Sequence, residues 1–357
     1  MITQSYNVVG VMSGTSLDGI DLAHIQLNVS DGKWDYKIFD AETIAYTPQW
    51  VEKLKVAIDY TEAELFALNS EYTIMLSSII NEFIVRHDLK DLDAVCSHGH
   101  TILHRPHDGI TLQIGNLPQI ATLTGQRVVC DFRVADVALG GQGAPLVPIG
   151  DRLLFTKYTY CLNLGGFSNI SFEENGIRIA FDICPVNTVL NFYAHKLGFD
   201  YDDAGAIAAS GIVNNGLLTA LNALDFYASS YPKSLGFEFV KQTILPLVEG
   251  YNDSPQNNLA TFTEHVAVQI AKVIEQKAIA GSLLITGGGA YNKTLINRMQ
   301  QLLPQINSVV PNDKTVQYKE ALIFALLGVL KLRGEVNVLG SVTGAAKDHI
   351  SGILYSV

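Results

Sequence analysis

Apolar positions alternate with polar ones in some stretches of the chain and recur every three to four residues in others. Strict alternation is typical of a half-buried strand, and the longer repeat is typical of a helix packed on one face. In the first hundred residues the pattern predicts strands at 6–11, 20–29 and 92–97, one or two strands within 33–46, and helices within 48–86.

The opening pattern returns in the second half of the chain. An apolar strand at 157–164, a small-residue turn at 165–169 and a strand at 177–183 precede a helical stretch at 187–197. This similarity predicts a weak internal duplication of a strand–turn–strand unit. The remaining predicted elements are helices at 205–225, 258–279, from 292 onward and about 318–332, with a strand at 282–286.

Length and one glycine-rich segment indicate two domains. The chain has 357 residues, and domains typically hold roughly 100–200. The segment LGGQGAP, at 139–145, packs three glycines and a proline into seven residues, so we expect the chain to cross between domains there.

The chain is acidic and poor in charge. It has 24 basic and 35 acidic side chains, a net charge of −11, and 17% charged against 48% hydrophobic residues. Nucleic acids and anionic lipids bind clustered Lys and Arg. We therefore expect neither a nucleic acid nor a membrane as partner, and an anionic ligand would need to be held by local geometry.

The cysteines and the N-terminus indicate a cytoplasmic protein. Cys96, Cys130, Cys161 and Cys184 are far apart and lack metal-finger spacing, so reduced thiols are expected. The N-terminus lacks the basic and apolar regions of a signal peptide. The longest helix-like apolar run, 321–330, is too short to cross a bilayer core of ~30 Å.

Three small-residue turns follow predicted strands: GVMSGTSLDGID at 10–21, NLGGFSN at 163–169 and TGGGAYN at 286–292. Glycine amides and Ser or Thr hydroxyls can converge on phosphate oxygens, and Asp18 could orient a water of Mg²⁺. Each turn alone is as readily an ordinary turn, but three of them over both halves predict one nucleotide held between two lobes. The candidate nucleotide and phosphate ligands are Gly10, Ser13, Gly14, Thr15, Ser16, Asp18, Gly165, Gly166, Ser168, Asn169, Gly287, Gly288 and Gly289.

Two further segments carry candidate chemistry. SHGHTILHRPH, at 97–107, holds four histidines, and we weigh a substrate contact, a solvated loop and, least favoured for want of a nearby carboxylate or cysteine, a metal site. In FDICPVN, at 181–187, Asp182 stands at a strand end, where its carboxylate either points into a cleft or caps the strand.

Together with DFRVADVALGGQGAPLVP at 131–148, PKS at 232–234 and VTGA at 342–345, these motifs resemble the anhydro-N-acetylmuramic acid kinase family over nearly the whole chain. The resemblance implies an α/β fold of two ribonuclease-H-like lobes around a nucleotide cleft, as in actin and sugar kinases. Lobe I would be 1–137 plus about 312–357, and lobe II would be 138–311.

The resemblance also implies the reaction. The family uses ATP and Mg²⁺ to open the 1,6-anhydro ring of anhydro-N-acetylmuramic acid with water and to phosphorylate O6, which yields N-acetylmuramic acid 6-phosphate in peptidoglycan recycling. Asp182 matches the general base and Glu320 a second acid that holds the water, while Gly287 to Gly289 would lie at the adenosine. A homodimer agrees with the resemblance. The sugar contacts it implies are Ser97, His98, Gln113, Asp136 and Asn187.

The chain departs from the family pattern at five positions. Cys184 and Val186 replace glycines beside the base, Leu235 and Phe237 replace Thr and Arg after PKS, and Ala135 replaces a basic residue. Two alternatives therefore stay open at this point: a kinase for a related anhydrosugar such as levoglucosan, and a nucleotide-binding regulator that has lost catalysis.

Overall fold

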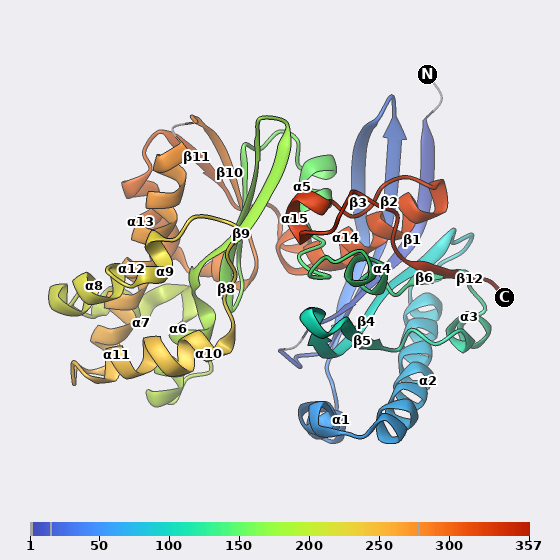
Figure 1. The fold of residues 1–357 in the computed structure, drawn as a ribbon, viewed down its shortest axis with the longest axis horizontal. Coiled ribbons are helices and arrows are strands. Elements are labelled where there is room, and N and C mark those ends of the chain that lie inside the picture. The colour runs from blue at the N-terminus through green and yellow to red at the C-terminus, as the bar shows by residue number, and fades with distance from the viewer. Residues whose placement is uncertain (1–2, 15, 278) are drawn as a thin grey trace. The chain divides into compact units, whose positions relative to one another are not determined.

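The computed structural model describes residues 3–14, 16–277 and 279–357. They form two compact units, which are coloured along the chain in Figure 1. Unit 1 consists of Met1–Phe155 and Tyr318–Val357, and unit 2 consists of Thr156–Gln317. Each unit has its own β-sheet with helices packed against it.

The described residues of unit 1 form a seven-stranded sheet. Its strands run in the order β12-β6-β4-β1-β2-β3, with β5 paired to β4. The neighbours β1, β2 and β3 are antiparallel, whereas β4 is parallel to β1 and β6 is parallel to β4. The strands are β1 (Gln4–Ser13), β2 (Ile20–Ser30), β3 (Lys33–Ile44), β4 (Ala94–Arg105), β5 (Ile110–Ile114), β6 (Val128–Cys130) and β12 (Ile353–Tyr355).

Helices cover both faces of this sheet. Val9 and Val11 of β1 share a buried cluster with α2 residues such as Leu76, and the ring of Phe324 in α14 packs against that of His98 in β4, with centroids 4.6 Å apart. A capping box of Thr61 and Glu64 starts α2. The helices are α1 (Pro48–Val56), α2 (Glu62–Arg86), α3 (Gln119–Thr124), α4 (Val134–Ala138), α5 (Pro148–Leu154), α14 (Asp313–Arg333), which begins in unit 2, and α15 (Gly340–Thr343).

Glycines let α14 lie unusually close to its neighbours in unit 1. A Cβ on Gly10 of β1 would stand 2.1 Å from the carbonyl oxygen of Ala321. A Cβ on Gly328 of α14 would stand 2.1 Å from Sγ of Cys96 in β4. Any side chain at either position would push the helix off the sheet.

Unit 2 repeats the topology of unit 1. Its sheet runs β11-β10-β7-β8-β9; β7, β8 and β9 are antiparallel, and β10 and β11 continue in parallel from β7. This is the order and direction of β6-β4-β1-β2-β3, the ribonuclease-H-like arrangement, so the predicted duplication is confirmed. The strands are β7 (Tyr160–Leu164), β8 (Phe167–Glu174), β9 (Ile177–Pro185), β10 (Gly281–Thr286) and β11 (Ile306–Val309).

The helices of unit 2 pack around α12, whose Phe262, Val266 and Ile270 are fully buried. The predicted helix at 205–225 is divided, because Gly211 packs against the carbonyl of Gln256 and the chain restarts as α8 after it. The helices are α6 (Asn187–Lys196), α7 (Ala206–Ser210), α8 (Asn215–Asn222), α9 (Asp225–Ala228), α10 (Phe237–Phe239), α11 (Leu245–Glu249), α12 (Pro255–Lys277) and α13 (Lys293–Leu302).

The division between the units differs from the predicted one. The first crossing falls after Phe155 rather than near residue 140. Residues 138–155 pack within unit 1, where Asp151 of α5 forms a 2.7 Å ion pair with Lys319 of α14. The backbone N–H of Gln142 also donates to the carbonyl of Thr343. These contacts outweigh the tendency of glycine and proline to mark a boundary.

Two simpler expectations can be compared with the structure. All four cysteines are buried and none forms a disulfide, in agreement with the expected thiols. Among the described residues, no single helix combines the length and apolar character needed to cross a membrane, although the bent pair Asp203–Ser210 and Asn215–Asn222 meets that test jointly.

The contact between β1 and α14 predicts a stability effect. We expect Gly10→Ala to lower the free energy of unfolding by about 1–3 kcal/mol, because the new methyl group overlaps the Ala321 carbonyl. Chemical denaturation of the ligand-free protein measures it. Gly14→Ala is the control, since its Cβ would meet only Ser16 Oγ at 3.6 Å. Equal stabilities of the two variants would contradict the packing role of Gly10.

Candidate functional site

The first small-residue turn begins where β1 ends. Ser13, the last residue of β1, places its hydroxyl 2.8 Å from Nδ1 of His100 and 2.6 Å from the hydroxyl of Tyr46. Burial lowers the pKa of His100 to about 4, so its ring is neutral at pH 7. Ser13 is thus held by neighbours. Gly14, Ser16 and Asp18 lie beyond it on the partly open turn, and Thr15 lies outside the described residues.

Carboxylates gather beside this turn in unit 1. Burial raises the pKa of Asp21, and the nearby charge of Asp18 raises it further, while a 2.6 Å hydrogen bond from Thr43 opposes both effects. The charge of Asp21 also reaches Glu320 of α14. Asp21 was missed as a candidate, although a second acidic residue in the motif DGID was a visible signal.

Glu320 is exposed to solvent, and the surrounding protein still desolvates its carboxyl group. Desolvation by the surrounding protein raises its pKa, and Asp21 adds to the rise. The positive charges of Arg133 and Lys319 act in the opposite direction. A carboxyl that solvent reaches but protein surrounds can exchange a proton with a bound ligand or water.

Arg133 is the first of the two cations that act on Glu320. Its Nε–H donates to Nε2 of His98 at 2.9 Å, and one terminal nitrogen donates to the carbonyl of Gly143 at 2.6 Å. His98 in turn has Nδ1 3.0 Å from the carbonyl of Gly99, which fixes the neutral tautomer that accepts from Arg133. Arg133 was not among the residues predicted for the site, although it stands in the motif DFR at 131–133.

Three of the predicted sugar contacts are buried and serve the protein's own structure. The hydroxyl of Ser97 accepts from the N–H of Gly99, and both ring nitrogens of His98 are engaged. Asp136 is fully buried and accepts from the N–H of Gly143 and the hydroxyl of Thr343, each at 2.7 Å. These side chains hold strand β4 and the Gly140–Gly143 loop in place.

Gln113 differs from those three. Its amide nitrogen donates to the hydroxyl of Thr111 at 2.9 Å, but its buried Oε1 has no hydrogen-bond partner among the described residues. A buried acceptor without a partner costs about 1–3 kcal/mol, so it suits a donor supplied by a ligand or water.

In unit 2, Asp182 lies near the end of β9 and is fixed by backbone groups. Its Oδ2 accepts from the N–H of Leu235 at 2.8 Å, and its own N–H donates to the carbonyl of Lys233 at 3.1 Å. Burial raises the pKa of Asp182, and the Leu235 amide partly lowers it. Asn169 pairs with Asp182 across β8 and β9 and is exposed, so the two side chains share one face of the sheet.

The second small-residue turn is shorter than predicted, because β8 already begins at Phe167. The carbonyls of Gly165 and Gly166 accept from the first amides of α6 at Asn187 and Thr188. Ser168 is fully buried, and its hydroxyl bonds both the N–H and the carbonyl of Cys184. Ser168 therefore ties β8 to β9, and Gly166 is the exposed position of the turn.

The third turn borders a cavity of about 430 Å³ within unit 2. Gly287 has φ +82°, and a Cβ on Gly289 would stand 2.7 Å from Leu164 Cβ, so the turn packs against the end of β7. Gly288 and Gly289 line the cavity together with Asn187 of α6. Its volume lies in the range of small-ligand sites.

The structure gives little support for a metal site built from protein side chains alone. The described residues contain no group of three His, Cys, Asp or Glu side chains arranged to hold one. Asp18 and Asp21 offer the carboxylate oxygens that Mg²⁺ prefers, and such an ion usually completes its shell with waters and phosphates. The donor set therefore fits Mg²⁺ that arrives with a nucleotide.

Comparison with known proteins decides the family. The sequence profile of anhydro-N-acetylmuramic acid kinase matches residues 6–357. Relatives bearing that name include one from Aliivibrio fischeri, 36% identical over 97% of this chain and 98% of its own, and one from Pseudomonas fluorescens, 35% identical over the same shares. The chain belongs to the anhydro-N-acetylmuramic acid kinase family.

Solved structures that match over most of this chain have much lower identity. One is component A of the (R)-2-hydroxyglutaryl-CoA dehydratase of Acidaminococcus fermentans, with a TM-score of 0.47, 15% identity and coverage of 92% of this chain and 99% of that one. Another is the activator of the 2-hydroxyisocaproyl-CoA dehydratase of Clostridium difficile, with a TM-score of 0.45, 12% identity and coverage of 92% and 96%.

Membership in the anhydro-N-acetylmuramic acid kinase family gives the departures near Asp182 a structural meaning. Cys184 and Val186 are fully buried in the core of unit 2, and burial raises the pKa of the Cys184 thiol to about 12. Leu235 contacts Asp182 through its backbone, which any residue except proline supplies. These substitutions leave the support of Asp182 intact.

The Arg133 cluster predicts a measurable shift. We expect Arg133→Met to raise the pKa of Glu320, because it removes a positive charge that stabilises the carboxylate. Carboxyl-detected NMR titration, assigned with Glu320→Gln, measures this. Arg105→Met, at an exposed site, should leave the Glu320 pKa unchanged. An unaltered titration in Arg133→Met would contradict the proposed coupling.

Proposed function

We propose that this protein is an ATP-dependent kinase that opens the 1,6-anhydro ring of anhydro-N-acetylmuramic acid and phosphorylates O6, as a step of peptidoglycan recycling. The full-length family match carries the proposal. The half-buried Asp182 supports it from the chemistry, because its carboxylate accepts from the N–H of Leu235 and its own N–H donates to the carbonyl of Lys233. No observed feature favours a different sugar or a regulator without catalysis.

The reaction needs a base beside the anomeric carbon. A water oxygen bonds to C1 and the C1–O6 bond breaks, O6 bonds to the γ-phosphorus, and ADP leaves. The attacking water loses a proton, which we assign to the carboxylate of Asp182. Burial raises the pKa of Asp182 from the range of an exposed aspartate towards the working pH, which makes it a stronger base.

Glu320 and its neighbours in unit 1 are assigned a supporting role. We propose that the Glu320 carboxylate orients the attacking water and that Arg133 keeps this carboxyl ionised. Gln113 Oε1 would accept a hydrogen bond from a sugar hydroxyl or amide. The roles proposed for Glu320, Arg133 and Gln113 rest on contacts within unit 1.

ATP is assigned to the small-residue turns. We propose that the adenosine occupies the 430 Å³ cavity beside Gly288 and Gly289. The amides of Gly14, Ser16 and Gly166 would donate to phosphate oxygens. Mg²⁺ bound with the nucleotide would neutralise phosphate charge. Asp18 would orient this ion through a water, with Asp21 beside it.

Replacing the proposed base tests the chemistry directly. We expect Asp182→Asn to lower kcat by about 10²–10⁴-fold, because the amide cannot take the proton of the water. A coupled ADP-release assay with the anhydrosugar measures kcat, and calorimetry should find ATP affinity unchanged. Asp200→Asn, at an exposed site of the same unit, is the control. Near-normal turnover of Asp182→Asn would assign the base elsewhere.

The backbone support of Asp182 predicts a pH effect. Protonation of Asp182 removes the base, so kcat should fall as the pH drops through its raised pKa and be full above it. Leu235→Pro removes the amide that lowers this pKa, so the acidic limb should move to higher pH. Leu235→Ala keeps the amide and should keep the limb. Identical pH profiles for both variants would contradict this support.

The adenosine assignment predicts a steric effect. A Cβ on Gly288 would meet only Asn187 Nδ2, at 3.6 Å, so the fold tolerates a side chain there. We expect Gly288→Leu to fill the cavity and to raise the KM for ATP at least about tenfold, while Gly288→Ala changes it little. Steady-state kinetics at saturating sugar measures this. Equal KM values in both variants would place the adenosine outside this cavity.

A further inference from the structure

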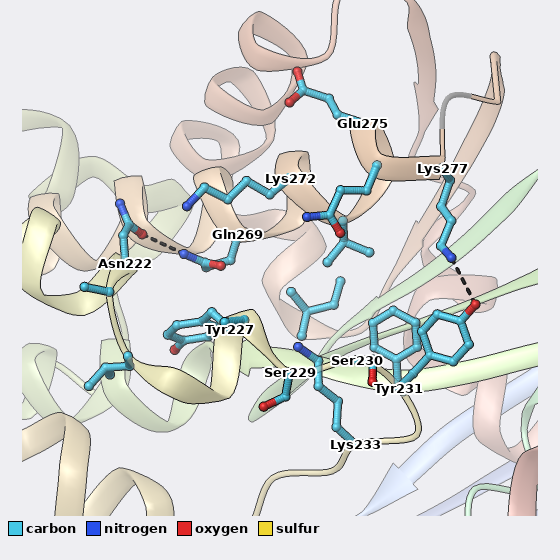
Figure 2. Close-up of a pocket in the computed structure, with 17 residues that line it drawn as sticks. Asn222, Tyr227, Ser229, Ser230, Tyr231, Lys233, Gln269, Lys272, Glu275 and Lys277 are labelled. Carbon is cyan, nitrogen blue, oxygen red and sulfur yellow. Dashed lines mark hydrogen bonds between the residues drawn. The ribbon is translucent and has the colours of Figure 1, made fainter.

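A second and larger cavity in unit 2 is lined by none of the residues assigned to catalysis. It has a volume of about 740 Å³ and lies among β9, the α9 region and the C-terminal half of α12 (Figure 2). The segment that follows α9 closes it with Ser229, Ser230 and Tyr231. The cavity is large enough for a phosphorylated sugar.

The cavity is positively charged, although the chain has a net charge of −11. Three lysines and one glutamate, Glu275, line it. Lys277 is neutralised by Glu174, at 2.9 Å. Lys233 donates to the carbonyl of Phe226, and neither it nor Lys272 has an acidic partner among the described residues. Lys233 and Lys272 therefore remain to pair with an anion, and with Glu275 counted the net charge of the lining stays positive.

Neutral groups in the same cavity suit a hydroxylated ligand. Gln269 Nε2 donates to Asn222 Oδ1 at 2.7 Å, which orients both amides and leaves the other half of each for further bonds. Figure 2 shows Lys272 on α12 near these two amides. Phe181 and Tyr231 stack with centroids 5.1 Å apart and rings inclined by 7°, which makes a flat, rigid wall. Oriented amides beside aromatic rings bind sugar hydroxyls and C–H faces well.

We propose that this cavity is a second binding site, for a small anionic sugar such as a sugar phosphate. The anion would pair with Lys272 and Lys233, and the hydroxyls would meet Asn222, Gln269 and the serines of the closing segment. The site shares β9 with Asp182, since Phe181 and Ile183 line it, and Lys233 supplies the carbonyl that binds the Asp182 N–H. The proposal concerns binding and does not depend on the proposed kinase reaction.

Calorimetry with glucose 6-phosphate as the probe tests the site. We expect the wild-type protein to bind it with a Kd of about 1 mM or tighter. Lys272→Glu should weaken binding at least tenfold, and Lys272→Gln should weaken it less. Lys241→Glu makes the same charge change at an exposed site of unit 2 outside the cavity and should bind as the wild type. Equal weakening by both reversals, or none by Lys272→Glu, would overturn the proposal.

Further measurements distinguish an anionic sugar from a neutral sugar or a free anion. Glucose should bind at least tenfold more weakly than glucose 6-phosphate, and inorganic phosphate should also bind more weakly. Equal binding of either probe would overturn the assignment to an anionic sugar. Asp182→Asn should bind glucose 6-phosphate normally, whatever its turnover, so failure of the kinase reaction is distinguishable. Unchanged thermal unfolding of Lys272→Glu shows that its weaker binding does not come from misfolding.

Discussion

The close contact of α14 with the sheet of unit 1 is the constraint that places Glu320 near the turn that follows β1. Gly10 in β1 meets the backbone of Ala321, the residue after Glu320, and Gly328 meets Cys96. Interiors are packed too tightly to absorb an added side chain at such distances. These two glycines hold Glu320 beside the turn that follows β1. Gly10, predicted as a phosphate ligand, therefore serves the site through packing.

Unit 2 uses backbone contacts for a similar purpose. The turn at Gly287 and Gly289 can lie against the end of β7 because glycine has no side chain. A Cβ at either position would overlap atoms at the end of that strand. Asp182 is held by the amide of Leu235 and the carbonyl of Lys233. Backbone hydrogen bonds are insensitive to most substitutions, which explains how this chain departs from its family around the base and keeps the base in place.

The two candidate carboxylates depend on different surroundings. Glu320 sits among charged groups of both signs, so its ionisation follows Arg133 and Asp21 as well as burial. Asp182 responds to burial and one amide. In both cases desolvation is the largest effect and raises the pKa, because a protein environment stabilises a charge less well than water does. Beyond burial, neighbouring charges therefore adjust the pKa of Glu320, whereas a backbone amide adjusts the pKa of Asp182.

The sequence by itself determined the strand–turn–strand repeat and the family, and it singled out Asp182 as the candidate base, because periodicity and motif spacing are local properties of the chain. It placed the domain boundary near residue 140, whereas the two units divide after Phe155, because the ion pair of Asp151 and Lys319 joins residues far apart in sequence. Only the tertiary structure separated buried Asp136 from half-buried Asp182, and only it brought Arg133 near Glu320. Burial and electrostatic coupling arise from distant segments, so no local pattern could reveal them.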